Sequence, residues 1–368
     1  MARILITGGA GFIGCHLSRA LLLRGYQVRV LDCLLDQVHA HQPRDPVLAD
    51  VELVVGDVRD PDIVRQVLTG ADAVVHLAAE VGVGQSMYAV DRYIATNDLG
   101  TATLLQALLA HPVERLVVAS SMSIYGEGLY RDAEGNLLED VIRQPRPSTG
   151  SWDPLDRHGR PLVPLPTPET KRPALASVYA ISKFVQERLI LTVGSAYGMR
   201  AVALRLFNVY GPGQALSNPY TGVLAIFAAA LLNGRAPAVY EDGLQRRDFV
   251  HVDDVANAFV LALDAGEHRC GAYNIGSGCA VTIADVAAAV AAAMGRGDVR
   301  AEFLNKARAG DIRHCFGDIS LARRELGYVP KRTLAESLPG LAEWVRRQHT
   351  VHRVDEARRE LEQRGLVA

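Results

Sequence analysis

Short apolar runs alternate with longer amphipathic segments along the first half of the chain. The runs are rich in β-branched residues, which is typical of buried strands, whereas the segments between them repeat apolar residues at helical spacing. Strands that alternate with helices form parallel sheets covered on both faces. The pattern predicts an α/β fold with a doubly wound parallel sheet, whose strands we expect at 4–7, 28–31, 53–55, 73–77, 116–119 and 201–206.

The alternation stops between Gly126 and Ser177, where prolines and polar residues dominate. Long irregular stretches inside a compact domain are usually functional or mobile, so we interpret this one as an insertion or lid. After Pro212 the pattern becomes mixed and predicts a smaller mixed α/β lobe, with helices near 222–232, 252–263, 283–294 and 334–348.

A chain of 368 residues exceeds the usual size of a single core. We expect a sheet domain over residues 1–210, which carries the proline-rich insertion at about 127–176. A lobe that is discontinuous in space follows over 211–350. The highly charged end, 351–368, is expected to be a solvated helix or tail.

The composition is that of a globular enzyme, with 49% hydrophobic and 22% charged residues and a formal net charge of −2. This balance predicts no general attraction to nucleic acid or to a membrane surface. Five cysteines without a CxxC pair argue against a disulfide framework and against a metal site. No signal peptide is expected because a strand-like run directly follows Arg3, and the alanine-rich stretch 281–294 is too short to span a bilayer. We expect a cytoplasmic enzyme.

The strongest local motif is TGGAGFIG, in which Gly8, Gly11 and Gly14 follow the first expected strand and open a helix. Glycines at this spacing let the backbone approach a pyrophosphate, whose charge a helix N-terminus stabilises. Asp32 ends the second expected strand, where a carboxylate meets the adenosine ribose and repels a 2′-phosphate. The motif predicts a Rossmann-type domain that binds NAD in preference to NADP.

Gly56, Asp57 and Val58 follow the third expected strand. Two interpretations remain open here. Asp57 and Val58 contact the adenine edge of the cofactor, or the aspartate forms an ordinary Asp turn.

A second element, YAISK, places Tyr179 and Lys183 one helical turn apart on the same face. A tyrosine is a poor base at neutral pH, but a nearby ammonium and the positive nicotinamide favour its phenolate. The sequence ASSMSIYG ends the fifth expected strand in hydroxyls, and we expect Ser121 to orient a substrate alcohol there. Together with the glycine motif, the three residues predict a dehydrogenase-type catalytic centre.

From residue 3 to about 344 the chain resembles the extended short-chain dehydrogenases/reductases of the nucleotide-sugar epimerase/dehydratase family. The segments that carry the resemblance are TGGAGFIG, GDVRD, HLAAEVGVGQS, SSMSIYG, YAISK, LRLFNVYGP, RRDFVHVDD, YNIGSG and RAGDIRH. The resemblance implies a tightly bound NAD, regenerated in each turnover, in the N-terminal domain and a nucleoside-diphosphate sugar in the C-terminal lobe.

The resemblance also implies roles for single residues. Ser121 would hydrogen-bond the sugar O4, Tyr179 would be the general base, and Lys183 would hold the nicotinamide ribose. Further cofactor contacts are expected from Phe12, Ile13, Leu77, Ala78, Ala79 and Asn97. Substrate contacts are expected from Ser123, Asn208, Arg247, Arg308 and Asp311, with the two arginines on the diphosphate. The alternative for these arginines is a salt bridge with Asp248 or Asp311.

Departures from the family pattern narrow the reaction. The 4,6-dehydratases of the family follow the catalytic hydroxyl with Asp-Glu, whereas this chain has Met122 and Ser123, which cannot act as that acid and base. We therefore expect a 4-epimerase. A 4-keto sugar reductase or dehydrogenase that uses NAD(P) is the alternative, and a scaffold that binds NAD without turnover is a more distant one.

The substrate is predicted less closely. Asn218, Tyr220 and Thr221 lie where family members wrap the nucleotide and sugar, and an ordinary loop is the alternative. Cys315 stands where some UDP-hexose 4-epimerases have a tyrosine. The smaller cysteine would leave room for a larger sugar. Within the family the motifs are most similar to dTDP-L-rhamnose 4-epimerases and UDP-glucose 4-epimerases, so a dTDP- or UDP-hexose is expected. The resemblance also implies a homodimer that pairs helices near 91–109 and 179–196.

Overall fold

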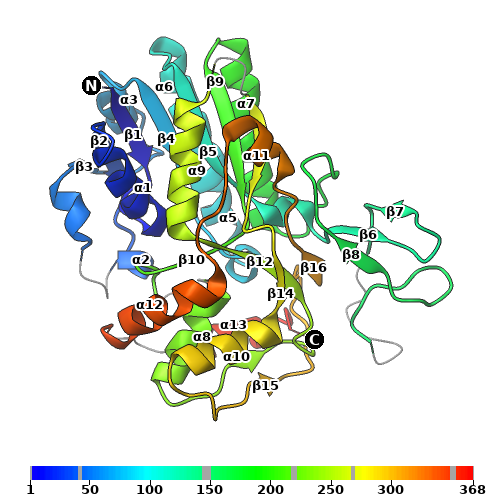
Figure 1. Ribbon diagram of the computed structural model, residues 1–368. Helices are drawn as coiled ribbons and strands as arrows, with labels where there is room; N and C mark the ends of the chain where they lie inside the picture. Colours follow the sequence, from blue (N-terminus) through cyan, green and yellow to red (C-terminus); the bar gives the residue numbers. More distant parts are fainter. Residues whose placement is uncertain are drawn as a thin grey trace.

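The computed structural model describes residues 2–39, 44–142, 151–216, 222–266, 270–348 and 354–367. A seven-stranded parallel sheet forms the upper part of the molecule in Figure 1. Its strand order is β13-β9-β5-β4-β1-β2-β3, so the order reverses beside β1 as in doubly wound folds. The strands are β1 (Arg3–Thr7), β2 (Gln27–Asp32), β3 (Glu52–Val55), β4 (Ala73–His76), β5 (Arg115–Ser121), β9 (Arg200–Leu206) and β13 (Gly271–Ile275).

Successive side chains of each strand enter opposite cores, as the pleat of a strand requires. In β1, Ile4 and Ile6 pack in one apolar cluster, whereas Leu5 packs in the other. The first cluster is covered by α1 (Phe12–Leu22), α9 (Val252–Asp264) and α11 (Ser320–Leu326). The second is covered by α3 (Pro61–Leu68), α6 (Gly100–Ala110) and α7 (Val178–Ala196).

Short helical segments lie between these elements in the sheet domain. They are α2 (Asp36–His39), η1 (Pro46–Ala49), α4 (Val83–Ser86), α5 (Val90–Tyr93), the π-helical segment η2 (Ile94–Leu99) and η3 (Met122–Tyr125). Segments α5, η2 and α6 follow one another without a break, so residues 90–110 form one long helical element.

A smaller lobe lies below the sheet in Figure 1 and has its own apolar core. Its helices are α8 (Val223–Leu232), α10 (Ile283–Ala293), α12 (Leu334–Arg346) and α13 (Val354–Gln363). A mixed four-stranded sheet joins β10 (Asn208–Tyr210), β12 (Arg246–His251), β14 (Ala280–Thr282) and β16 (His314–Cys315). A second pair consists of β11 (Ala238–Val239) and β15 (Glu302–Phe303).

The fold class predicted from the sequence is confirmed, and all six expected strands are present. Two features were not predicted. The lobe contributes α9 and the seventh strand, β13, to the sheet layer, and the proline-rich insertion contains an antiparallel sheet of β6 (Leu129–Arg131), β7 (Leu137–Leu138) and β8 (Val163–Leu165). The domain boundary at residue 210 stays a prediction. No helix in the described ranges has the length and hydrophobicity that a membrane crossing requires.

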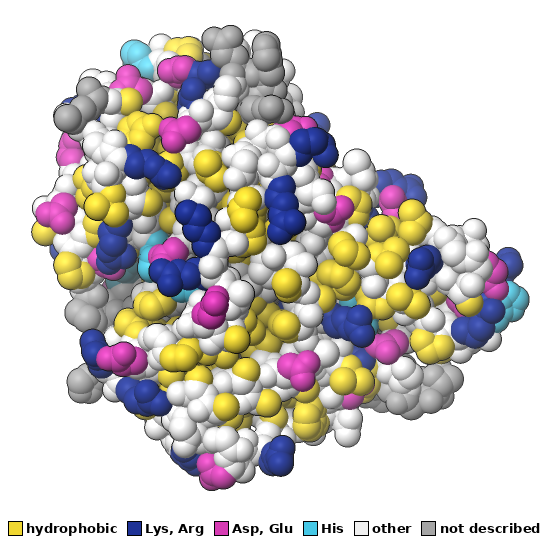
Figure 2. All heavy atoms as spheres, in the orientation of Figure 1, with side chains coloured by type: hydrophobic (Ala, Val, Ile, Leu, Met, Phe, Trp, Pro, Cys, Tyr) yellow, Lys and Arg dark blue, Asp and Glu magenta, His cyan; other side chains and the backbone are white. Residues whose placement is uncertain are grey.

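Charged side chains of both signs are interspersed over the face seen in Figure 2, with hydrophobic side chains between them. This mixed surface agrees with the net charge of −2 and shows no extended field of one sign on that face.

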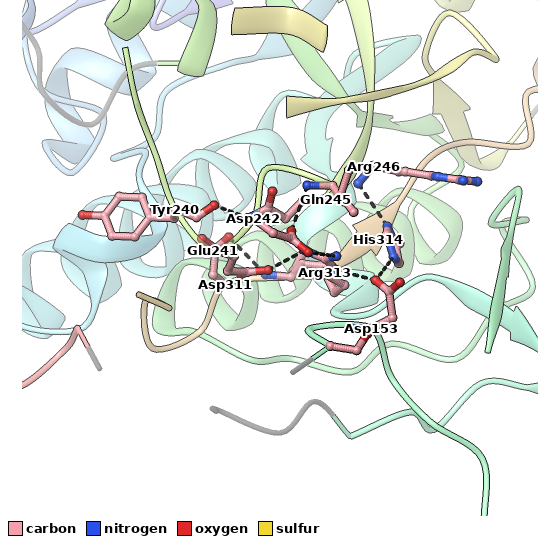
Figure 3. A network of polar contacts seen from close by, with 12 residues as sticks. Asp153, Tyr240, Glu241, Asp242, Gln245, Arg246, Asp311, Arg313 and His314 are labelled. Atoms are coloured by element: carbon pink, nitrogen blue, oxygen red, sulfur yellow. Dashed lines mark hydrogen bonds and ion pairs between the residues drawn. The ribbon is translucent and has the colours of Figure 1, made fainter. Parts of the chain in front are cut away.

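A buried arginine ties the insertion to the lobe (Figure 3). The side chain of Arg313 is 0% exposed and donates to Glu241 at 2.8 Å, to Asp242 at 2.6 Å and to Asp153 of the insertion at 2.7 Å. His314, the next residue, also contacts Asp153, at 3.1 Å between Nε2 and Oδ1. These charge-assisted contacts hold the pKa of the Asp153 carboxyl well below its usual range.

Because Glu241 is as fully buried as Arg313, removing the arginine would take a cationic partner away from a buried carboxylate. We expect Arg313→Met to lower the free energy of unfolding by about 3–5 kcal/mol, measured by urea denaturation. Arg324→Met is the matched control, since the exposed Arg324 pairs with Glu325 at the surface, and we expect it to cost less than about 1 kcal/mol. Equal effects of the two substitutions would contradict this role of Arg313.

Candidate functional site

A cavity of about 1200 Å³ separates the carboxyl edge of the sheet from the lobe. Its walls include the loops that follow β1, β2, β3 and β4, the end of β5, the first turn of α7, and residues of the lobe around β12 and 308–312. Ligands of doubly wound sheets bind at this edge, beside the point where the strand order reverses. The position of each site residue expected from the sequence can therefore be described relative to this cavity.

The glycine loop between β1 and α1 lines one end of the cavity, with Phe12 and Ile13. Gly8 has φ of +70°, and a Cβ there would lie 2.6 Å from the backbone nitrogen of Ala78. A Cβ on Gly14 would lie 2.4 Å from the carbonyl oxygen of Gly9. Only glycine fits at both positions, so the loop packs against β4 and leaves a cradle for a pyrophosphate at the start of α1.

Asp32 lies at the end of β2, beside that loop, and lines the cavity. Its carboxylate accepts hydrogen bonds from the backbone N–H of Ala10 at 3.0 Å and of Leu34 at 2.9 Å. The side chain therefore both caps the turn and brings a negative charge to the cavity wall, where a 2′-phosphate would be repelled.

Asp57 and Val58 also line the cavity. The Asp57 carboxylate accepts from the backbone N–H of Arg59 at 2.8 Å and pairs with its guanidinium at 2.6 Å. The hydrogen bonds from Arg59 hold the pKa of this carboxyl below its usual value. The Asp turn is thus present, and the position of Asp57 leaves the expected adenine contact in place as a prediction.

Strand β5 extends two residues further than expected and includes Ser120 and Ser121. Because side chains alternate along a strand, the two serines have different surroundings. Both residues line the cavity, but the Ser120 hydroxyl donates to the buried Glu187 at 2.6 Å, whereas the Ser121 hydroxyl accepts from Ser123 Oγ at 2.8 Å. Of the three serines in ASSMSIYG, Ser121 and Ser123 therefore orient each other, whereas Ser120 is held by Glu187.

Tyr179 stands in the first turn of α7, whose start is fixed by Ser177, the acceptor of a hydrogen bond from the backbone N–H of Ala180 at 3.1 Å. The phenol is half-buried and is hydrogen-bonded to Ser121. Burial raises its pKa, and the Ser121 hydrogen bond opposes that rise. The structure thus brings Ser121 and Tyr179 together, as the sequence predicted.

Lys183 lies one turn later and is buried, with its ammonium donating to Gln186 Oε1 at 2.7 Å. Burial lowers its pKa to about 7, against the opposing charge of Glu187. The Gln186 amide donates to Thr101 Oγ1 at 2.9 Å. Sequence reasoning missed Gln186, although its spacing of three residues from Lys183 places both on one helix face.

The same network ends on His76, the last residue of β4. Its ring nitrogens lie 2.7 Å from Thr7 Oγ1 and 2.9 Å from Thr101 Oγ1, and Gln186 Nε2 approaches to 3.2 Å. Burial, and then the charge of Lys183, lowers its pKa to about 3. The ring is therefore neutral at physiological pH and holds the Lys183 side of the site by hydrogen bonds alone.

On the lobe side, the expected substrate residues Asn208, Arg247, Arg308 and Asp311 all line the cavity. Asn208 has a buried Oδ1 without a hydrogen-bond partner among the described residues. The Arg247 guanidinium donates to the carbonyl oxygens of Arg313, at 2.9 Å, and of Ile312. The unpartnered oxygen of Asn208 at the cavity wall favours a ligand that donates a hydrogen bond.

Asp311 lies between the two expected arginines. It pairs with Arg308 at 2.9 Å and approaches Arg247 at 3.6 Å. Arg308 also stacks over the ring of Tyr240, 4.6 Å from its centroid. The alternative of a salt bridge with Asp311 is therefore present, whereas Asp248 instead accepts from the backbone N–H of Ser277 at 2.7 Å.

Two expected contacts are not placed at the cavity. Asn97 is buried and braces the backbone of Glu80, accepting from its N–H at 2.7 Å, and Cys315 packs in an apolar cluster with Phe207 and Ile312. Neither lines the cavity wall, so a direct contact with cofactor or sugar is not supported for them. Asn218, Tyr220 and Thr221 lie outside the described residues. Leu77, Ala78 and Ala79 do line the cavity.

The buried neutral His76 predicts acid sensitivity. The unfolded chain binds a proton at the ordinary histidine pKa of 6.5 and the folded chain only near 3, so stability is lost as the pH falls below about 6.5. The loss is at most about 1.4 kcal/mol per pH unit. We expect His76→Asn to flatten the pH dependence of urea unfolding in this window, whereas the same change at the exposed His111 should leave it as in the wild type. The same pH dependence of unfolding in all three proteins would contradict the lowered pKa of His76.

Comparison with known proteins agrees with this geometry. The model of the NAD dependent epimerase/dehydratase family matches residues 4–148 and 159–276. A dTDP-L-rhamnose 4-epimerase of Burkholderia thailandensis is 37% identical, with 93% of this chain and 94% of that protein covered. A dTDP-glucose 4,6-dehydratase of Streptomyces niveus is 31% identical, over 94% of this chain and 93% of that protein.

Solved structures are similar over nearly the whole chain. The crystal structure of a UDP-glucose 4-epimerase of Thermotoga maritima with UDP-glucose has a TM-score of 0.76 at 28% identity, covering 94% of this chain and 98% of that one. A UDP-glucuronic acid 4-epimerase of Bacillus cereus in complex with UDP-glucuronic acid and NAD also has a TM-score of 0.76, at 25% identity, covering 93% and 98%. On its sequence, its fold and the placement of its site, this chain belongs to the NAD dependent epimerase/dehydratase family.

Proposed function

We propose that the protein is an NAD-dependent 4-epimerase of a nucleoside-diphosphate sugar, a dTDP- or UDP-hexose such as dTDP-L-rhamnose. The observation that carries the proposal is the position of the Ser121 and Tyr179 pair. It lies in one cavity between the glycine loop and Asp32 on one side and Asn208 and the lobe arginines on the other. The 37% identity to a dTDP-L-rhamnose 4-epimerase supports the choice of sugar.

The residues of the chain divide the work of such a reaction. Ser121 hydrogen-bonds the C4 hydroxyl of the sugar, and Tyr179 removes its proton and returns it in the second half of the reaction. The Lys183 ammonium stabilises the phenolate, because a nearby positive charge favours the ionised tyrosine. The glycine loop and Asp32 would hold NAD, which would supply the acceptor and donor of the C4 hydride. The whole sequence is redox-neutral.

The neighbours of Ser121 favour epimerisation over dehydration. Met122 and Ser123 follow it, and neither is an acid or a base for the loss of water. Ser123 is instead a second hydroxyl that orients Ser121. A 4-keto reductase is the second candidate because it would use the same three residues, but the Asp32 carboxylate at the cofactor wall disfavours NADPH.

On the substrate side, Asn208 Oδ1 is suited to accept from a sugar hydroxyl, and Arg308 reaches the cavity as a cation for the diphosphate. Before substrate binds, Asp311 keeps Arg247 and Arg308 oriented by its ion pairs with them. We assign the protein to carbohydrate biosynthesis in the cytoplasm on the strength of this substrate class.

We also propose a homodimer. Large apolar side chains are exposed along the α5–η2–α6 element and on α7, namely Val90, Ile94, Leu99 and Ile181, with 37–55% of their surface accessible. Exposed apolar residues gathered on adjacent helices favour association. Tyr179 lies on α7 as well, so the interface would support the helix that carries the base.

The function is tested by incubating the purified protein, without added cofactor, with dTDP-L-rhamnose, UDP-galactose and UDP-N-acetylglucosamine in separate reactions. We expect proton NMR to show a C4 epimer of at least one sugar, because redox-neutral turnover needs no external NAD(H). A product that forms only from a 4-keto sugar with added NAD(P)H would favour the reductase instead.

Two tyrosine variants serve as the matched pair in that assay. Tyr179→Phe removes the proposed base and should lower the rate by about a hundredfold or more. Tyr197→Phe changes an exposed tyrosine just past the end of the same helix and should leave the rate unchanged. Near wild-type turnover by Tyr179→Phe would exclude the mechanism.

The dimer is tested by light scattering. The wild type should have twice the mass of one chain, and Leu99→Lys should shift it toward the monomer because a charge would enter an apolar interface. Leu23→Lys changes another exposed leucine, just past the end of α1, and should not alter the mass. A monomeric wild type at working concentration would refute the proposal.

A further inference from the structure

The C-terminal segment, expected from the sequence to be a charged, solvated helix or tail, contains the helix α13, and the end of this helix also contacts the rest of the protein. Leu361, on this helix, is 6% exposed and forms part of the wall of the cavity. Figure 1 places the C-terminus in the half of the molecule that the lobe forms, away from the N-terminus at the outer part of the sheet. The composition of 351–365 concealed this contact, because Leu361 is the only leucine in a mostly charged stretch.

One side of the helix contacts α4 and the residues just after it. The Leu361 side chain packs over Gly84, where an added Cβ would lie 3.4 Å from Leu361 Cδ1. Tyr88 donates from its hydroxyl to Glu360 Oε2 at 3.0 Å. The Arg364 guanidinium lies over the same ring, 4.3 Å from its centroid, at a distance suited to a cation–π contact.

The other side contacts the lobe loop that carries Arg308. Lys306 pairs with Glu362 at 3.0 Å. The backbone N–H of Ala309 donates to the carbonyl oxygen of Leu366 at 2.9 Å, and Arg308 forms a β-bridge with Val367. Residues 360–367 therefore join the sheet domain to the lobe across the cavity, next to the arginine expected on the diphosphate.

We propose that residues 360–367, the end of α13 and the segment after it, form a closing wall of the substrate cavity, which retains the nucleotide sugar and its 4-keto intermediate during turnover. This inference rests on the proposed function. An epimerase must keep the keto sugar bound while it rotates, since its escape would leave the hydride on the cofactor and the enzyme inactive. Leu361 supplies an apolar surface there, and the polar contacts around it hold the surface in place.

The strength of the contacts suits a wall that also admits substrate. Lys306 and Glu362 are each more than one-third exposed, and ion pairs of this kind contribute little to stability. Leu361, in contrast, is buried, so its removal should be felt at the cavity. We therefore infer that Leu361 retains the sugar in the cavity and that Tyr88 anchors the helix that carries Leu361.

Leu361→Ser in the full-length protein tests the wall. We expect the KM for dTDP-L-rhamnose, or for whichever sugar the wild type epimerises, to rise by about tenfold, the value of a buried contact worth about 1.4 kcal/mol. The keto sugar should also appear in the medium, with reduced cofactor left on the protein and seen by its near-ultraviolet absorbance. Tyr88→Phe should show the same changes to a smaller degree.

Gln363→Ser is the matched control, because Gln363 lies on the same helix and is exposed. It should behave as the wild type, and equal cofactor content in all variants would exclude unfolding. Wild-type KM and no released keto sugar in Leu361→Ser, beside an active wild type, would overturn the proposal.

A second readout separates this proposal from the proposed function. Hydrogen exchange of the backbone amides of 360–366 should slow when dTDP or UDP is added to the wild type, whether or not any sugar is turned over. Slower exchange in a protein that epimerises none of the three sugars would refute the function and keep the wall. Unchanged exchange in an active enzyme whose cavity is saturated would refute the wall.

Discussion

The parallel pairing of the seven strands is the constraint on which the site depends, because it places the carboxyl ends of neighbouring strands at one edge. Strand β1 leads into the glycine loop, β2 ends at Asp32, β4 ends at His76 and β5 ends at Ser121. Each of these residues is far from the others in sequence. The chain therefore needs no single catalytic segment, since the sheet assembles the cofactor wall and the catalytic hydroxyl together.

Burial of Lys183 sets the chemical character of the centre. A lysine whose pKa is lowered to about 7 by burial is charged for only part of the time at neutral pH. The chain surrounds it with neutral partners, namely Gln186 and, through it, His76 and Thr101. These hydrogen bonds orient the ammonium, and no carboxylate of the described residues pairs with it, so its charge stays available to the phenol of Tyr179. Orientation and electrostatics are thus supplied by different residues.

The features of the site that could be predicted are those that a short stretch of the chain determines by itself. The glycine motif, Asp32 and the Tyr179–Lys183 spacing could be located from the sequence because strand and helix periodicities fix their neighbours. The seventh strand was missed, since 271–275 returns to the sheet only after the chain has entered the lobe and formed α8 and β12. Asn97 and Cys315 show the limit of a motif, because their side chains turned toward structural partners that are distant in sequence. The wall formed by Leu361 could not be predicted, because it arises only from tertiary contacts between distant parts of the chain.

The most direct test of the account follows a single atom. dTDP-L-rhamnose, or the sugar that the protein epimerises best, is labelled with deuterium at C4 and incubated in ordinary water without added cofactor. If the hydride leaves C4 and returns to the same sugar, the epimer will carry the deuterium at C4 in full, as NMR and mass spectrometry can measure. Loss of the label to solvent, or product only when reduced cofactor is added, would contradict an epimerase that works by transient oxidation at C4.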